Sequence, residues 1–150
     1  MPDEKRSVLA SSRDVRDYLL TKENSMYNYP WLDQYCLSKP GTEKDFKEEW
    51  NATRYMLCGK MFAMAGGDKT GKPIITLKLN PDDGAALRER YGDIIPGYYM
   101  NKEHWNSVYL EGSVPDDVMR GMIDASHSLI LESLPKKKRE EILFPQGRQD

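Results

Sequence analysis

Three short apolar segments in the middle of the chain constrain the fold more than any other feature. Their sequences are TRYMLC (53–58), KMFAMA (60–65) and IITLKL (74–79). In the third segment, apolar residues at 75, 77 and 79 alternate with Thr76 and Lys78, as on the two faces of a strand. A turn at Gly59 and a glycine-rich loop at 66–73 join the segments, and such short connections join strands that run in opposite directions. The segments therefore predict an antiparallel sheet.

Helix signals flank these segments. The sequence Asn80-Pro81-Asp82-Asp83 combines a capping side chain, a proline at the first helical position and acids in the first turn. A longer helix begins at Pro115 and continues through apolar residues at helical spacing, namely Val118, Met119, Met122, Ile123, Leu129, Ile130 and Leu134. A first helix is expected between Pro30 and the Pro40-Gly41 pair. Each of these helices needs a partner for its apolar side.

The remaining segments complete an α+β fold. We expect Gly97–Lys102 and Trp105–Glu111 to form two strands or a hairpin. The predicted order is α-β3-α-β2-α, a two-layer fold in which helices cover one face of an antiparallel sheet of about five strands. The helix that begins near Asp82 and the final helix should share that face. The charged segment KDFKEEW (44–50) is ambiguous and receives no assignment.

The chain has 150 residues, enough for one domain with its own core. We divide it into a polar N-terminal extension (1–28), a folded domain (29–140) and a C-terminal tail (141–150). The extension should be dispensable for folding, because it supplies few apolar side chains. No stretch approaches the roughly 18 continuous apolar residues of a membrane span, and the first 20 residues lack the apolar core of a signal peptide. We therefore expect a cytoplasmic protein with no membrane partner; the sequence leaves the oligomeric state open, and we favour a monomer.

Motifs that carry chemistry are weak in this sequence. The segment GGDKTGK (66–72) resembles a phosphate-binding loop, but Pro73 stands where Ser or Thr is required, and a strand follows instead of a helix. The two histidines and two cysteines show none of the spacings typical of zinc sites. His104 has no nucleophile beside it in the sequence, which favours a packing or hydrogen-bonding role over general-base catalysis. We expect no cofactor, no metal and no catalytic residue, and hence a non-enzymatic protein.

Charge is distributed unevenly along the chain. The formal net charge is −2 and the pI about 5.8, whereas domains that bind nucleic acid commonly have a pI above about 9. Between residues 55 and 80, however, four lysines accompany one acid, and the final helix (115–134) has four acids and one arginine. The sheet therefore has a locally basic face, which either meets phosphates or is simply solvated.

The segment PGYYMNKEHWNSVYL (96–110) mixes aromatic rings with amides and a lysine. In our first hypothesis it belongs to a DNA-binding surface, with Lys60, Lys78 and Lys102 on phosphates and Asn101 and Trp105 on sugar or base. Three phosphate contacts would give a salt dependence with a log–log slope of about −2.7. The alternative is a small-molecule or protein-binding module with a pocket lined by Tyr98, Met100, His104 and Trp105.

Four segments together resemble the MmcQ/YjbR family, also described as YjbR-like or CyaY-like DNA-binding proteins. They are CGKMFAM (58–64), ITLKLNP (75–81), IIPGYYMNKEHWNSVYLEG (94–112) and IDASHSLILESLPKKKR (123–139). The resemblance spans about residues 29 to 140, and it implies a compact α+β fold and a DNA-binding role that rests on fold analogy. It implies no catalytic residues. The chain departs from the family pattern at Tyr99, where members often have His, and at His127, where they often have Tyr.

Overall fold

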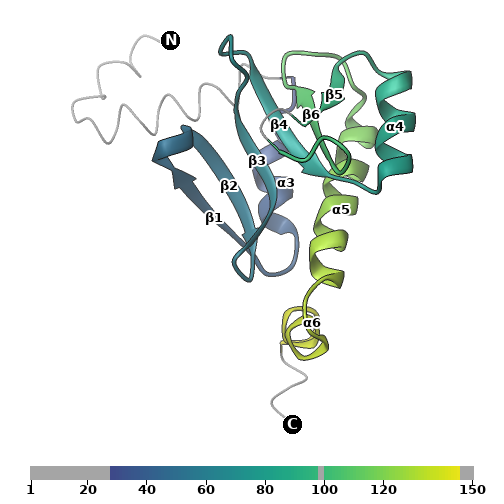
Figure 1. Ribbon diagram of the computed structural model, residues 1–150. Helices are drawn as coiled ribbons and strands as arrows, with labels where there is room; N and C mark the ends of the chain where they lie inside the picture. The colour runs from purple at the N-terminus through teal and green to yellow at the C-terminus, as the bar shows by residue number, and fades with distance from the viewer. Residues whose placement is uncertain (1–27, 98–99, 146–150) are drawn as a thin grey trace, which may run out of the picture.

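The computed structural model describes residues 28–97 and 100–145, whose arrangement is shown in Figure 1. The elements follow in the order α3 (Leu32–Ser38), β1 (Thr42–Lys47), the 3-10 helix η1 (Glu48–Trp50), β2 (Ala52–Leu57), β3 (Lys60–Gly67), β4 (Pro73–Lys78), α4 (Pro81–Arg90), β5 (Ile94–Pro96), β6 (Trp105–Tyr109), α5 (Asp116–Glu132) and α6 (Lys136–Leu143). The strands form one sheet in the order β1-β2-β3-β4-β6-β5, and every neighbouring pair is antiparallel. The predicted α+β fold with an antiparallel sheet is confirmed. The N-terminal extension, up to residue 27, lies outside the described residues.

One face of the sheet carries the core. Tyr55, Ala63 and Leu77 lie opposite one another on β2, β3 and β4, so their side chains point to the same face, and all three are buried. The helix residues packed in the same cluster include Leu32 and Cys36 of α3, Leu87 of α4, and Met119, Met122 and Ile123 of α5. The prediction that α4 and the long helix after Pro115, which is α5, share one face of the sheet is therefore confirmed. We call this the helix face and the opposite one the open face.

Two neighbouring polar residues of α5 fix the position of this helix on the sheet. The Ser126 hydroxyl donates to the Phe62 carbonyl at 2.5 Å and accepts from the Lys78 amide at 2.9 Å. The Nε2 atom of His127 lies 2.8 Å from the Pro40 carbonyl, and its ring packs edge-on against Phe62 with 5.1 Å between centroids. Both side chains are buried. These contacts set the height of α5 along β3 and β4.

The structure corrects the expected elements in three places. The sheet has six strands instead of about five, because the charged segment left unassigned forms β1 and η1. The described part of the expected strand at 97–102 is irregular, and the strand before it is the short β5. The chain also turns at Pro135 into a separate helix, α6, which begins inside the expected folded domain and ends in the expected tail.

Charged side chains explain why β1 is a strand despite its composition. As an edge strand, β1 needs only β2 as a hydrogen-bonding partner, and charged residues are favoured at such edges. Arg54 donates two hydrogen bonds, of 2.8 and 2.6 Å, to the carboxylate of Asp45, its cross-strand partner. Lys44 forms a 2.7 Å salt bridge with Asp33 of α3. Long-range partners thus stabilise a strand that has almost no apolar pattern.

Candidate functional site

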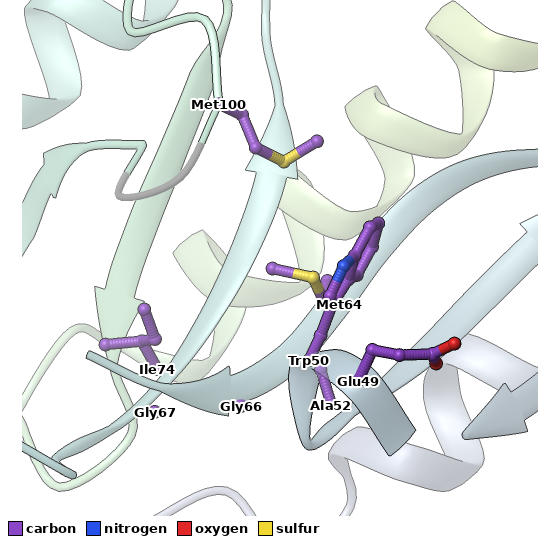
Figure 2. Close-up of a pocket in the computed structure, with 8 residues that line it drawn as sticks. All are labelled: Glu49, Trp50, Ala52, Met64, Gly66, Gly67, Ile74 and Met100. Carbon is purple, nitrogen blue, oxygen red and sulfur yellow. The ribbon is translucent and has the colours of Figure 1, made fainter. Parts of the chain in front are cut away.

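A pocket of about 400 Å³ lies on the open face of the sheet. Its lining comes from η1, β2, β3, β4 and the loop between β5 and β6, and consists of Glu49, Trp50, Ala52, Met64, Gly66, Gly67, Ile74 and Met100. Figure 2 shows the Trp50 ring beside Met64, with Met100 and Ile74 across the pocket from Trp50. The surface that these residues present is mostly apolar. A concave, mostly apolar site with a few polar groups at its edge is typical of small-molecule binding.

Two consecutive glycines at the end of β3 leave room in the pocket. A Cβ atom added at Gly66 would lie 3.2 Å from the Cβ of Ala52 on the neighbouring strand, which is a tight contact. Glycine weakens a strand, and it is found where a ligand or another backbone approaches closely. Gly66 and Gly67 therefore form a floor of bare backbone between Ala52 and Ile74.

Trp50 forms one wall of the pocket. The chain turns from η1 into β2 at Asn51, whose left-handed conformation (φ 50°) leaves the Trp50 side chain 52% exposed. The Lys47 ammonium lies 5.5 Å and the Arg54 guanidinium 5.7 Å from the centroid of its ring. The hydrogen bonds from Arg54 hold the pKa of Asp45 below its usual value. The indole thus lies near two cations, of which Arg54 already has an anionic partner in Asp45.

The opposite wall is the loop between β5 and β6, which carries Met100. The Asn101 carboxamide oxygen accepts hydrogen bonds from the amides of Glu103 at 2.8 Å and His104 at 3.3 Å. Backbone hydrogen bonds also hold the two ends of the loop. At its start, the Gly97 amide donates to the Trp105 carbonyl of β6 at 2.6 Å; at its end, the His104 carbonyl accepts from the amide of Leu79, just after β4, at 2.7 Å. Asn101 therefore shapes the loop that places Met100 at the pocket.

The predicted pocket residues are only partly brought together. Met100 lines the pocket, whereas Trp105 and His104 are not among its described lining residues. The His104 side chain is partly exposed, and its Nε2 atom lies 4.0 Å from the Glu103 carboxylate. Tyr98 lies outside the described residues, as does Tyr99, where the chain departs from the family pattern. Met100 is thus the one predicted pocket residue that the described structure places at the site.

The predicted DNA-contacting residues cluster at the other end of the strands, on different faces. Lys78 and Trp105 are cross-strand partners on the open face, four residues along β4 from Ile74, or about 13 Å. Lys60 lies at the same end of the sheet, but its Nζ atom donates to the Ser133 hydroxyl just beyond α5 at 3.2 Å. Its cross-strand partner is Leu57, which belongs to the core. Lys60 is thus on the helix face, and the exposed Lys102 is in the loop beside Lys78 and Trp105.

The loop that resembles a phosphate-binding motif satisfies its own amides. One carboxylate oxygen of Asp68 accepts from the amides of Thr70 at 2.8 Å and Lys72 at 2.9 Å, and from the Thr70 hydroxyl at 2.7 Å. The side-chain hydrogen bond from Thr70 is the main cause of the lowered pKa of Asp68. Backbone amides that would hold a phosphate are therefore bound to a carboxylate of the same loop. The plain interpretation, a hairpin loop, agrees with this geometry.

Most pocket residues were missed by sequence reasoning because they come from separate elements. Two local signals were present: a pair of glycines inside a strand segment, and Trp50 at the end of a charged segment. The alternation in β4 also placed Thr76 away from the core, and its strand partner Met64 lines the pocket. No local signal identifies Ala52 or Ile74 as lining residues, since the register of three strands brings them together.

Two other features are absent from the described residues. In residues 28–97 and 100–145, no group of three or more His, Cys, Asp or Glu side chains is arranged to hold a metal ion. None of the helices in these same ranges has both the length and the apolar character needed to cross a bilayer.

The chain matches known proteins over most of its length. The family model described as YjbR matches residues 37–129. Escherichia coli K12 protein YjbR is 37% identical over 109 residues, which cover 73% of this chain and 92% of that protein. Bacillus subtilis protein YyaQ is 28% identical over 122 residues, covering 81% and 98% of the two chains.

Solved structures show the same fold. The crystal structure of Deinococcus radiodurans protein DR2400, which has a DUF419 domain, aligns with a TM-score of 0.68 and 28% identity, and covers 80% of this chain and 91% of that one. A Pseudomonas syringae protein aligns with a TM-score of 0.61 and 25% identity, and covers 68% and 97%.

Proposed function

The chain belongs to the YjbR family, and we propose that it is a binding protein whose open-face pocket takes a small, largely apolar molecule. The observation that carries this proposal is the 400 Å³ pocket lined by Trp50, Met64, Met100 and Ile74. Methionine side chains adapt to varied apolar ligands, and tryptophan supplies a large, flat contact surface. The proposal assigns no reaction to this pocket.

The test is ligand binding followed at the methionine methyl groups. A neutral aromatic probe, N-phenylnaphthylamine, is titrated into the full-length protein labelled at the methionine methyls, and NMR spectra are recorded. We expect the signals of Met64 and Met100 to shift, because both line the pocket. Met119 and Met122 serve as internal controls, because they are buried on the helix face. Unchanged signals of Met64 and Met100 at saturating probe would contradict the proposal.

A matched pair of variants adds a second readout. Trp50→Ala removes one wall of the pocket and should weaken probe binding about two- to tenfold, which corresponds to an aromatic contact of about 0.5–1.5 kcal/mol. Phe144→Ala removes another exposed aromatic ring, which lies outside the described pocket lining, and should leave binding unchanged. Because both side chains are more than half exposed, neither change should prevent folding.

DNA binding is the second candidate. The observation that favours it is the pairing of Lys78 with Trp105 on the open face, beside the loop of Asn101 and Lys102. An amine and an aromatic ring on one surface suit a nucleic-acid backbone and a base, respectively. Lys60 lies apart from this group, on the helix face, and so provides a control for a DNA-binding test.

A further inference from the structure

The shape of the pocket bears on the kind of molecule that it takes. Trp50 offers a half-exposed indole ring, and Figure 2 shows this ring standing next to Met64. Gly66 and Gly67 add no side chains to the floor between Ala52 and Ile74. A flat ring fits such a space, because it can pack against the indole and against the thioether sulfur atoms of the methionines.

The charges near Trp50 bear on the charge of that molecule. Two cations lie within 6 Å of its ring centroid, those of Lys47 and Arg54. Arg54 is engaged by both carboxylate oxygens of Asp45. Within the described part of the chain, no salt bridge engages Lys47.

Glu49 is the one acidic side chain among the described lining residues. Its carboxylate points away from Met64 and Met100 in Figure 2. Among the described residues, the cation at this wall that forms no salt bridge is therefore the Lys47 ammonium, although Asp45 lies near enough to interact with its charge. A third positive charge brought to the Trp50 ring would meet these two cations at close range, which disfavours cationic ligands.

We infer that the pocket prefers a planar aromatic molecule that carries a negative charge, with its ring against Trp50 and its anionic group toward Lys47. This inference rests on the proposed function, because it requires that the pocket hold a small molecule. It adds the class of ligand, an aromatic carboxylate, sulfonate or phosphate, and a residue, Lys47, that selects it. The selecting contact is exposed to solvent, so its effect on affinity should be modest and sensitive to salt.

Two matched probes test the inference. Anilinonaphthalene sulfonate and N-phenylnaphthylamine share one ring system and differ by the sulfonate group. With the full-length protein at low salt, we expect the sulfonate to bind about threefold more tightly or better. Lys47→Gln should remove this difference by weakening the sulfonate about threefold while leaving the neutral probe unchanged. Lys60→Gln is the control, because it removes the same charge on the helix face.

The outcomes separate the inference from the proposed function. If both probes shift the Met64 and Met100 methyl signals but bind equally well, or if Lys47→Gln has no effect, the charge preference is overturned. The proposed small-molecule pocket is then still supported. Tighter binding of the neutral probe overturns the preference in the same way. If neither probe shifts these two signals, both proposals are overturned.

Discussion

At the scale of single residues, His127 shows how the core treats a group that titrates near neutral pH. The side chain is 3% exposed, and its ring lies between the Pro40 carbonyl and Phe62. Burial, the largest influence, holds the pKa of His127 below its ordinary value of 6.5, although the hydrogen bond to Pro40 opposes this effect. A neutral imidazole that donates from Nε2 satisfies the carbonyl without placing a charge in the core.

This environment predicts that the domain is less stable in mild acid. Between the lowered pKa and 6.5, the unfolded chain binds more protons than the folded one, so the free energy of unfolding falls as pH drops through about 6.5. Denaturant unfolding at about pH 7.5 and pH 5.5 measures the loss. We expect His127→Gln, which keeps a donor but does not titrate, to reduce the loss. The control is His104→Gln, which removes the only other imidazole in the sequence and should leave the loss of stability in acid unchanged. If His104→Gln reduced this loss and His127→Gln did not, His127 would not be the responsible group.

At the scale of secondary-structure elements, Ser126 connects three of them. Its hydroxyl bonds to the Phe62 carbonyl of β3 and the Lys78 amide of β4 from within α5. Ser126→Ala would leave the buried Phe62 carbonyl and the partly buried Lys78 amide without this partner, and we expect a loss of about 1–3 kcal/mol in the free energy of unfolding. Ser128→Ala lies two residues away on the exposed side of α5 and should change stability by no more than about 0.5 kcal/mol. Equal effects in urea denaturation of the two variants would contradict this role of Ser126.

Local signals predicted the elements whose patterns are local. The Asn80 side chain accepts from the Asp82 amide at 3.0 Å at the start of α4, as the sequence of that turn indicates. The alternation in IITLKL likewise gave β4 and its core face. By contrast, β1 was missed because Asp45 and Lys44 acquire their partners only in the folded state. The strand predicted at Gly97–Lys102 was misplaced, because the Asn101 carboxamide shapes a loop there and the observed strand, β5, lies just before it.

At the scale of the whole molecule, the two faces of the sheet separate residues that looked equivalent in the sequence. The lysine-rich strands suggested one basic patch, but the register shift between β2 and β3 turns Lys60 toward the helices, whereas alternation along β4 places Lys78 on the open face. The pocket, likewise, could not be derived from any one segment, because the strand register brings Ala52, Gly66 and Ile74 together. A sequence pattern can give the faces of each strand, but the bulge between β2 and β3 decides which residues of neighbouring strands share a face.

The same separation sharpens the test for DNA. With a net charge of −2, the molecule as a whole does not attract DNA, so any binding depends on a local group of cations. If the open face binds a duplex, Lys78 and Lys102 are its phosphate contacts, and the log–log salt slope should be about −1.8, from roughly −0.9 for each phosphate.

The measurement is fluorescence anisotropy with short duplex and single-stranded DNA at about 50 mM and about 200 mM salt. The double variant Lys78→Ala, Lys102→Ala should lose most binding, and Lys60→Ala should keep it, because Lys60 points to the opposite face. Binding that depends on Lys60 instead would place DNA on the helix face, and no binding at micromolar protein in the lower salt would remove DNA as a candidate.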